Sequence, residues 1–481
     1  MNEEHEETAA FERRLSDADS LSWRLDANPV LRSHGVHIEV LDRAPDWDRL
    51  ATGYERLSRL VPRFRQRVVE SSLRQVTPAW IVDDRFDLSY HLRHVQLPAP
   101  GSMDNLLDLL HAYVATPLDR ARPLWEATVV EGLEGGRAAL FAKTHHSFLD
   151  GAGWVYVLGL QHDRERDAPA PPMPPAPAAE QVTPRRLATE GLLEDGASAL
   201  RAAPRWVAGL LGALGRTARH PRQSVTEAAR AVGSVAKSLQ LPPGSPLFEE
   251  RTLSRRVVLL DVSLDDVKRA GKAVDGTVND TIVAGLLDGL ARYHEHFGRR
   301  PTTLNTAIAI NVRRPDDPPL GNRIAAVMLT LPADILEPAQ RIRYIHDVVL
   351  EARSSPGLPI GALAPVLNRV LPPGLVGRFI AGQARNVDIG ISNMPGHRER
   401  LYLAGAEVGG IFGCPVSPQS IQVSIISYAG TCCIAAICDA AAVADPGLLG
   451  RCLKDGLDDV IGLAEGSRPA TLVAAPRSTA P

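Results

Sequence analysis

The sequence predicts an α/β protein built from two layered halves, and three observations support this prediction. The chain has 481 residues, and at about 150 residues per domain this length suggests two or three compact units. Helical stretches alternate with short apolar strands on both sides of a linker, which is typical of layered α/β domains. The linker contains a proline run at 167–177, whose backbone favours an extended polyproline II conformation.

These features divide the chain into four predicted parts. A first domain covers 15–165, a proline-rich and helical linker covers 166–245, and a second domain covers 246–465. The last part, 466–481, is rich in alanine, proline and polar residues, and this composition predicts a disordered tail. No repeat of fixed period is visible, which excludes solenoids and propellers.

Periodicity predicts the elements within these parts. Apolar residues at helical spacing predict a helix over 47–60 and a helical connection over 184–239, and apolar runs predict strands at 126–130 and 138–142. The predicted elements of the second domain are, in chain order, a strand at 256–262, helices at 264–273 and 279–294, a strand at 303–312, further strands through 438 and a helix at 446–463.

One stretch is long and apolar enough to require a test for membrane insertion. From residue 408 to residue 438 the chain carries no charge, and such a length could span a bilayer. Several glycines and prolines interrupt it, however, and 421–427 alternates between apolar and polar residues as a strand does. We therefore predict buried sheet here and no transmembrane helix.

Composition and charge exclude several other classes of protein. The formal net charge is -3, with 53 basic and 56 acidic residues, so no basic surface for nucleic acid is expected. The five cysteines form no C-x-x-C pair, which argues against a zinc or disulfide framework. We expect no metal and no bound cofactor. The acidic start has no apolar signal segment, and we expect a cytoplasmic protein.

The most informative local motif is His145-His146-Ser147-Phe148-Leu149-Asp150-Gly151, which follows the apolar strand at 138–142. A histidine at a strand end is accessible, and neutral imidazole suits a general base near neutral pH. Two adjacent histidines can also be a plain surface or core pair. Asp150 could orient the His146 imidazole or lock the loop by pairing with an arginine, and spacing does not decide between them. Gly151 is expected to serve the turn conformation or a close approach of substrate.

This motif resembles the HHxxxDG signature of the wax ester synthase/diacylglycerol acyltransferase family, within the wider HxxxD acyltransferase and condensation-domain superfamily. Further blocks resemble the same family in the same order, so that the resemblance extends from about residue 15 to residue 463 outside the linker. These blocks are LSDADS at 15–20, FRQR at 64–67, Trp80, Asp84, FDL at 86–88, His91, PLDR at 117–120, PLW at 123–125, VND at 278–280, GN at 321–322 and SNMPG at 392–396.

The resemblance implies a fold, a reaction and its residues. The fold would be a two-domain, chloramphenicol-acetyltransferase-like sandwich, each domain a mixed sheet with helices, joined by a long crossover. His146 would be the general base that deprotonates a long-chain alcohol or a diacylglycerol as it attacks acyl-CoA, giving wax ester or triacylglycerol and free CoA. His145 would shape the site, and Asp150 would hold the loop through Arg313.

The VND block allows two interpretations. The resemblance places Asn279 and Asp280 near the active site, whereas their position at a helix start equally fits plain capping of free backbone N–H groups.

Departures from the family pattern suggest a divergent branch. LSPxD reads LSDAD at 15–19, the VPVS strand reads IAIN at 308–311, and PLN reads PLF at 246–248. Two other functions stay open: a condensation-type acyltransferase acting on a carrier-bound or glycolipid acceptor, and a lipid-binding coat protein without catalysis.

Long acyl chains imply a lipid surface, and two segments could contact one. The first is an apolar stretch at 359–382, which could equally be a helix pair lining the acyl tunnel. The second surrounds Trp206, where flanking arginines could meet anionic lipid or merely be solvated. We therefore expect the protein to bind peripherally to a membrane or to a lipid-droplet surface.

Overall fold

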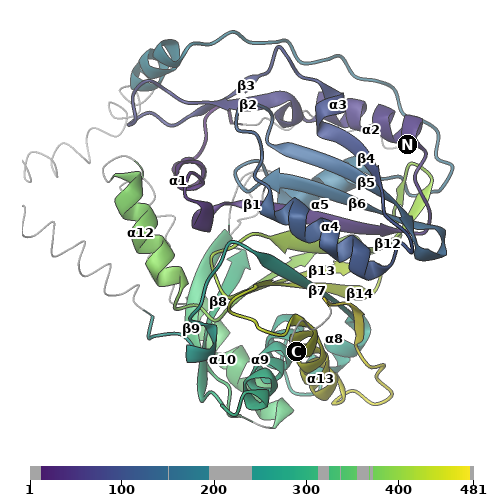
Figure 1. The fold of residues 1–481 in the computed structure, drawn as a ribbon, viewed down its shortest axis with the longest axis vertical. Helices are drawn as coiled ribbons and strands as arrows, with labels where there is room; N and C mark the ends of the chain where they lie inside the picture. Colours follow the sequence, from purple (N-terminus) through teal and green to yellow (C-terminus); the bar gives the residue numbers. More distant parts are fainter. Residues whose placement is uncertain are drawn as a thin grey trace, which may run out of the picture.

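Two β-sheets form the centre of the computed structural model, each with helices packed beside it (Figure 1). The structure describes residues 12–149, 151–193, 241–311, 324–335, 337–354, 368 and 372–476. Buried apolar side chains form two large clusters: the first covers the six-stranded sheet and extends onto residues of the other sheet such as Val257 and Cys433, and the second lies within the second half of the chain. This arrangement is the mixed, two-sheet α/β fold that the sequence predicted.

The first sheet has six strands in the order β11-β12-β1-β6-β5-β4. Its strands are β1 (His34–Leu41), β4 (Leu92–Gln96), β5 (Trp125–Leu133), β6 (Arg137–His145), β11 (Tyr402–Leu403) and β12 (Ala406–Pro415). The helices of this half are α1 (Asp17–Leu25), α2 (Trp47–Leu60), α3 (Leu88–His91), α4 (Met103–Ala115) and α5 (Gly151–Gln161), with 3-10 turns η1 (Pro29–Leu31), η2 (Pro62–Arg65) and η3 (Glu134–Gly136). A separate hairpin pairs β2 (Gln66–Val69) with β3 (Ala79–Val82).

The second sheet has seven strands in the order β15-β7-β14-β13-β10-β8-β9. Its strands are β7 (Arg255–Ser263), β8 (Thr303–Asn311), β9 (Ile324–Pro332), β10 (Ile389–Pro395), β13 (Ile421–Tyr428), β14 (Thr431–Asp439) and β15 (Thr471–Ala474). The other elements of this half are η4 (Pro246–Phe248), α8 (Leu264–Lys272), α9 (Val278–His296), α10 (Pro338–Ser354), α12 (Pro373–Ala384) and α13 (Pro446–Ile461). Helices α8, α9, α10 and α13 gather beside this sheet (Figure 1).

Two strands of the second half, β11 and β12, belong to the first sheet. β12 lies antiparallel to β1, with His37 opposite Gly413, and it leads directly into β13 of the second sheet. The predicted domain boundaries therefore do not divide the chain cleanly in space, because β11 and β12 belong to the range 246–465 but complete the sheet of 15–165. This crossover brings the two sheets together beside β12, where β12 contacts both β13 and β14.

Most predicted elements are confirmed, including the helix at 47–60 and the strands around 126–130 and 138–142. The uncharged stretch at 408–438 forms β12, β13 and β14, as predicted. All five cysteines are buried and free. Within the described residues, no helix has both the length and the apolar character needed to cross a bilayer.

The predicted disordered tail at 466–481 is wrong for part of its length. Residues of β15 pair antiparallel with β7, with Leu472 opposite Leu260. Thr471 and Val473 suit an edge strand by their β propensity, and Ala474 is buried in the first core. Of the predicted helical connection, residues 184–193 are helical, and the stretch around Trp206 lies outside the described residues.

Candidate active site

The histidine motif lies where β6 ends and α5 begins. β6 ends at His145, and the backbone N–H of Phe148 donates to the His145 carbonyl at 2.9 Å, which closes a tight turn. The backbone N–H of His146 donates to the carbonyl of Ser33 at 2.6 Å. The turn is therefore tied to the chain segment that precedes β1.

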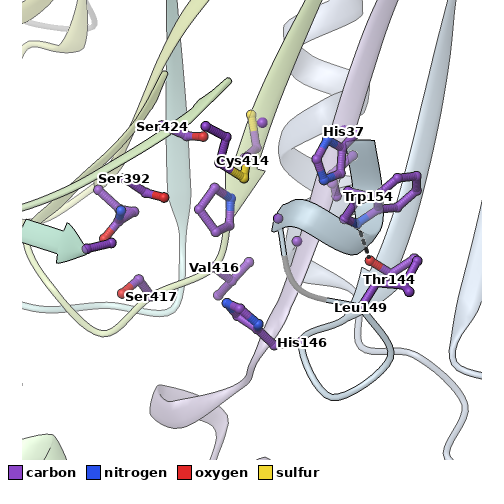
Figure 2. A pocket seen from close by; sticks show the side chains of 18 residues that line it. His37, Thr144, His146, Leu149, Trp154, Ser392, Cys414, Val416, Ser417 and Ser424 are labelled. Atoms are coloured by element: carbon purple, nitrogen blue, oxygen red, sulfur yellow. Dashed lines mark hydrogen bonds between the residues drawn. The ribbon is translucent and has the colours of Figure 1, made fainter. Parts of the chain in front are cut away.

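The side chain of His146 is exposed beside a cavity. Among the residues that the structure describes it makes no hydrogen bond or ion pair, and it lines a cavity of about 210 Å³. Figure 2 shows its ring on the side of the cavity where Val416 and Ser417 also lie. A free imidazole beside a cavity can take a proton from a bound hydroxyl.

The cavity draws its wall from both sheets. β1 and β12 of the first sheet form one part, and β10 and β13 of the second form another. The lining residues are Gly35, Val36, His37, Thr144, His146, Leu149, Gly151, Trp154, Ala309, Ser392, Met394, Gly413, Cys414, Pro415, Val416, Ser417, Gln422 and Ser424. The cavity thus lies where the crossover of β12 joins the two halves.

His145 points away from this cavity and is buried, with 3% of its surface exposed. Its Nδ1 accepts a hydrogen bond from the backbone N–H of Ser147 at 3.1 Å and lies 2.7 Å from the Ser147 hydroxyl. Because a neutral imidazole carries one proton, that proton belongs on Nε2. Nε2 faces the carboxylate of Asp26 at 3.5 Å.

Asp26 connects the two histidines. Its Oδ1 accepts the backbone N–H of Ser33 at 3.0 Å, and the carbonyl of the same Ser33 receives the N–H of His146. Burial would raise the pKa of Asp26, but the His145 ring and the Ser33 N–H hold the pKa of this carboxyl below its usual 3.8. One carboxylate therefore contacts the His145 ring and, through Ser33, anchors the backbone of His146.

Gly151 begins α5 at the cavity wall, and its lack of a side chain has a specific reason. A Cβ at this position would lie 2.0 Å from the Met394 sulfur of β10. Of the two expected explanations, close approach is therefore the relevant one, but the approaching group is Met394. Trp154, one turn later on α5, donates from its indole N–H to the Thr144 hydroxyl at 3.2 Å, which joins the helix to β6.

Asn279 and Asp280 are not among the residues lining this cavity. Asp280 accepts hydrogen bonds from the N–H and hydroxyl of Thr277, at 2.9 and 2.7 Å, and its own N–H donates to the Thr277 hydroxyl. It also pairs with His346 of α10 at 2.8 Å. Of the two interpretations, helix capping is the one that these contacts match, and the N-cap is Thr277 rather than Asn279.

Two predicted site residues, Asp150 and Arg313, lie outside the described residues, so their pairing stays a prediction. The described part of the chain contains no group of three or more metal-ligating side chains.

Sequence reasoning missed His37 and Asp26. His37 and Glu39 are polar residues among the apolar residues of β1, and Asp26 directly follows the last residue of α1. Each residue could have been noticed because it is polar next to apolar residues. The local sequence does not show, however, which distant strand or loop its side chain contacts.

Comparisons with known proteins identify the family of this chain. Residues 15–282 match the model of the wax ester synthase/diacylglycerol acyltransferase catalytic domain, and residues 320–460 match the C-terminal domain model of the same family. A Mycobacterium tuberculosis protein named as a diacylglycerol O-acyltransferase is 35% identical over 96% of this chain and 95% of its own length. A second protein so named from that organism is 31% identical over 90% of this chain and 93% of its own length.

Solved structures share the fold. The wax ester synthase/diacylglycerol acyltransferase of Marinobacter aquaeolei VT8 superposes with a TM-score of 0.62 at 22% identity, covering 94% of this chain and 99% of that one. The first condensation domain of the calcium-dependent antibiotic synthetase gives a TM-score of 0.59 at 15% identity, with coverage of 97% and 100%. Catalytic-domain match, sequence relatives and shared fold lead to one conclusion: the chain belongs to the wax ester synthase/diacylglycerol acyltransferase family.

Proposed function

We propose that this O-acyltransferase uses His146 as the general base that transfers an acyl group from acyl-CoA to the hydroxyl of a long-chain alcohol or a diacylglycerol. The observation that carries the proposal is the exposed His146 side chain, without a described partner, in the wall of the cavity between the sheets. Membership of the family and the names of the relatives support the reaction class.

The chemistry balances with His146 alone as the proton carrier. An unprotonated ring nitrogen takes the acceptor's hydroxyl proton while the oxygen attacks the thioester carbonyl. The carbon–sulfur bond then breaks, and the departing CoA thiolate recovers the proton from the imidazolium. An ester and free CoA result, with no acyl-enzyme. Ser147, two residues beyond the end of β6, is not required as a nucleophile, and its buried side chain is not among those that line the cavity.

The buried His145 and its partner Asp26 contribute to this step by holding His146 in place. We assign Asp26 and His145 to hold the turn so that the His146 ring faces the cavity, since both histidines are tied to the Asp26–Ser33 segment. Orientation of a catalytic base to within about 1 Å can be worth on the order of 100-fold in rate. Asp26 is thus a positioning residue rather than a catalytic one.

We expect no metal and no bound cofactor to take part, with acyl-CoA as a co-substrate. The step above needs only proton transfer and displacement at a thioester carbonyl. Activity should therefore survive incubation with a chelator, and inactivation that added metal reverses would contradict this expectation.

Contact with a lipid surface is assigned to α12. Leu375 and Phe379, four residues apart on one helix face, are 59% and 38% exposed, and Arg378 beside them is exposed too. The opposite face buries Val376 against Leu21, Leu25 and Leu31. Of the two interpretations of the stretch at 359–382, its described helix therefore supports the interfacial one. Loss of vesicle co-sedimentation in a Leu375→Ser/Phe379→Ser variant would support it, and unchanged co-sedimentation would overturn it.

The test of the reaction is CoA release from palmitoyl-CoA with hexadecanol or 1,2-dipalmitoylglycerol, with the ester product identified by mass. The parent should release CoA only when an acceptor is present. His146→Ala should reduce the rate by about 100- to 10,000-fold, the usual contribution of a general base. If acceptor-dependent CoA release persists in His146→Ala, His146 is not the general base. No release with either acceptor from folded parent would favour a carrier-bound or glycolipid acceptor.

A further inference from the structure

A second histidine, His37, lies in the wall of the same cavity. It stands in the middle of β1, opposite Gly413 of β12 and Ala142 of β6, and these small neighbours leave room for its ring. His37 is 8% exposed, and its ring lies 4.3 Å from that of Trp154. Figure 2 shows the two rings together at one end of the cavity, on the first-sheet side.

His37 differs from the other buried histidines that the structure describes. Each of the others has a ring nitrogen in a hydrogen bond: with backbone carbonyls for His34, His91 and His294, with a backbone N–H for His111 and His145, and with a carbonyl and Glu39 for His162. His37 has none among the described residues. Its Nδ1 is buried without a partner, as is Nε2 of His91 and of His145, whereas Nε2 of His37 is not buried in this way and is the nitrogen left to meet a group bound in the cavity. Buried polar groups are normally paired, so a bound hydrogen-bonding group would supply the partner that this ring lacks.

The charge state of His37 narrows the choice of that partner. Burial lowers its pKa to about 4, so the imidazole is neutral near pH 7. A neutral imidazole offers one N–H donor and one nitrogen acceptor. It therefore suits a hydroxyl or a carbonyl oxygen better than a phosphate or a carboxylate, which a cationic group binds more strongly.

The other polar groups of the cavity also suit a ligand with hydroxyl or carbonyl oxygens. Ser392 of β10, Ser417 before β13 and Ser424 of β13 line it, and their hydroxyls have no hydrogen-bond partner among the described residues. A cavity meant for a plain alkyl chain would leave these hydroxyls and His37 unpaired, at a cost in binding. A fatty acyl chain and an alkanol carry no oxygen beyond the one that reacts, whereas a glycerolipid carries several.

We propose that His37 is a specificity-determining residue that hydrogen-bonds a second oxygen of the acyl acceptor, and that the cavity thereby prefers a glycerolipid alcohol to an alkanol. This inference rests on the proposed acyl transfer, and it adds the residue that would discriminate between the two acceptors. His37 does not carry the reaction's proton, which stays with His146. His37 therefore raises kcat/KM only for acceptors that carry a second oxygen able to hydrogen-bond its ring.

The test compares the parent with His37→Phe and His37→Asn. Phenylalanine keeps a flat ring against Trp154 without hydrogen-bonding nitrogens, and asparagine restores a donor and an acceptor. For each protein, kcat/KM is measured with palmitoyl-CoA and either 1,2-dioctanoylglycerol or dodecanol. His37→Phe should lower the diacylglycerol-to-dodecanol ratio by about 10-fold, since loss of one hydrogen bond to a substrate is worth roughly that much, and His37→Asn should recover part of the ratio.

The outcomes separate this inference from the proposed function. An unchanged ratio, or an equal fall with both acceptors, would overturn it; an equal fall would assign His37 to the CoA arm or to folding. Calorimetric titration of 1,2-dioctanoylglycerol gives a second reading without turnover: about 10-fold weaker binding to His37→Phe supports the inference, and equal binding contradicts it. A parent that binds this lipid but releases no CoA would count against the proposed reaction alone.

Discussion

The turn after β6 and the start of α9 make an instructive comparison, because the sequence marks both with polar residues that resemble family motifs. At the start of α9, Asp280 has several partners: its carboxylate accepts two hydrogen bonds from Thr277, its backbone N–H donates to the Thr277 hydroxyl, and its Oδ2 lies 2.8 Å from Nδ1 of His346. In the turn after β6, the His146 side chain has no partner among the described residues and lines a cavity. The satisfied group stabilises the fold, and the unsatisfied group is available for chemistry.

The same contrast separates two neighbours within the turn. His145 and His146 are adjacent and chemically identical, yet His145 is buried against Asp26 and Ser147 while His146 is exposed. Alternation along the end of β6 sends the two side chains in different directions. Residue type alone therefore cannot assign a function, and the partner of each group must be known.

After the loss of His146 itself, the largest effect that would sharpen this contrast is expected at Asp26. Asp26→Ala removes the acceptor for the Ser33 N–H and the partner of His145, so we expect kcat to fall by about 10- to 100-fold through misplacement of His146. The free energy of unfolding should fall by about 1–3 kcal/mol, since a buried donor loses its partner. CoA-release kinetics and denaturant unfolding measure the two effects.

A matched variant distinguishes position from charge. Asp26→Asn keeps an oxygen for the Ser33 N–H, and we expect it to recover most of the kcat that Asp26→Ala loses. If Asp26→Ala unfolds more easily but turns over at the parental rate, Asp26 is structural only and the link to His146 is wrong.

A second effect concerns pH, because His37 is unsatisfied like His146 but buried. Its folded pKa of about 4 lies below the ordinary 6.5, so between these values the unfolded chain binds a proton that the folded chain does not. Stability from this group is present above pH 6.5 and is lost as pH falls toward 4. The parent should lose on the order of 3 kcal/mol more than His37→Phe over this range.

Denaturant unfolding at several pH values measures this difference, and the other buried histidines cancel because both proteins contain them. If the free energy of unfolding of the parent and of His37→Phe changes with pH in parallel, His37 is not buried in its neutral form. His37 would then not be an example of a buried histidine without a partner.

A smaller effect is expected where α5 meets β10. Gly151→Ala forces the Met394 side chain aside, since the added Cβ would lie 2.0 Å from its sulfur, and overpacking of this kind costs about 1–3 kcal/mol. Because Met394 is flexible and lines the cavity, we expect a reduced kcat/KM as well. Adding Met394→Ala should restore part of both, which a double-mutant cycle measures. Additive losses would show that the two residues do not interact.

Sequence reasoning predicted what depends on local pattern and family resemblance. The helix at 47–60 and the strands around 126–130 and 138–142 follow from periodicity, because their apolar faces are fixed by the chain itself. The position of His146 at a strand end followed in the same way. For the stretch that contains α12, the sequence left two interpretations open, an interfacial helix or a wall of the acyl tunnel, since an apolar face does not reveal what covers it.

The missing parts depend on contacts distant in sequence. That β12 joins the first sheet depends on its pairing with β1, more than 360 residues away by the register of Gly35 and Pro415. The contact of His37 with Trp154 needs β1 to lie beside α5, and the contact of Asp26 with His145 needs α1 to end beside β6. β15 was missed because four residues of edge strand give too short a pattern within a polar tail.

The measurement that tests the central claim most directly compares His146→Ala and Asp280→Ala side by side, by acceptor-dependent CoA release and by unfolding midpoint. We predict a crossed result. His146→Ala loses at least about 100-fold in kcat and keeps the parental midpoint, because its side chain has no described partner to lose. Asp280→Ala keeps the parental kcat below its midpoint but unfolds at lower temperature, because a buried cap is lost. CoA release that survives in His146→Ala, or is lost in a stable Asp280→Ala, would contradict the account.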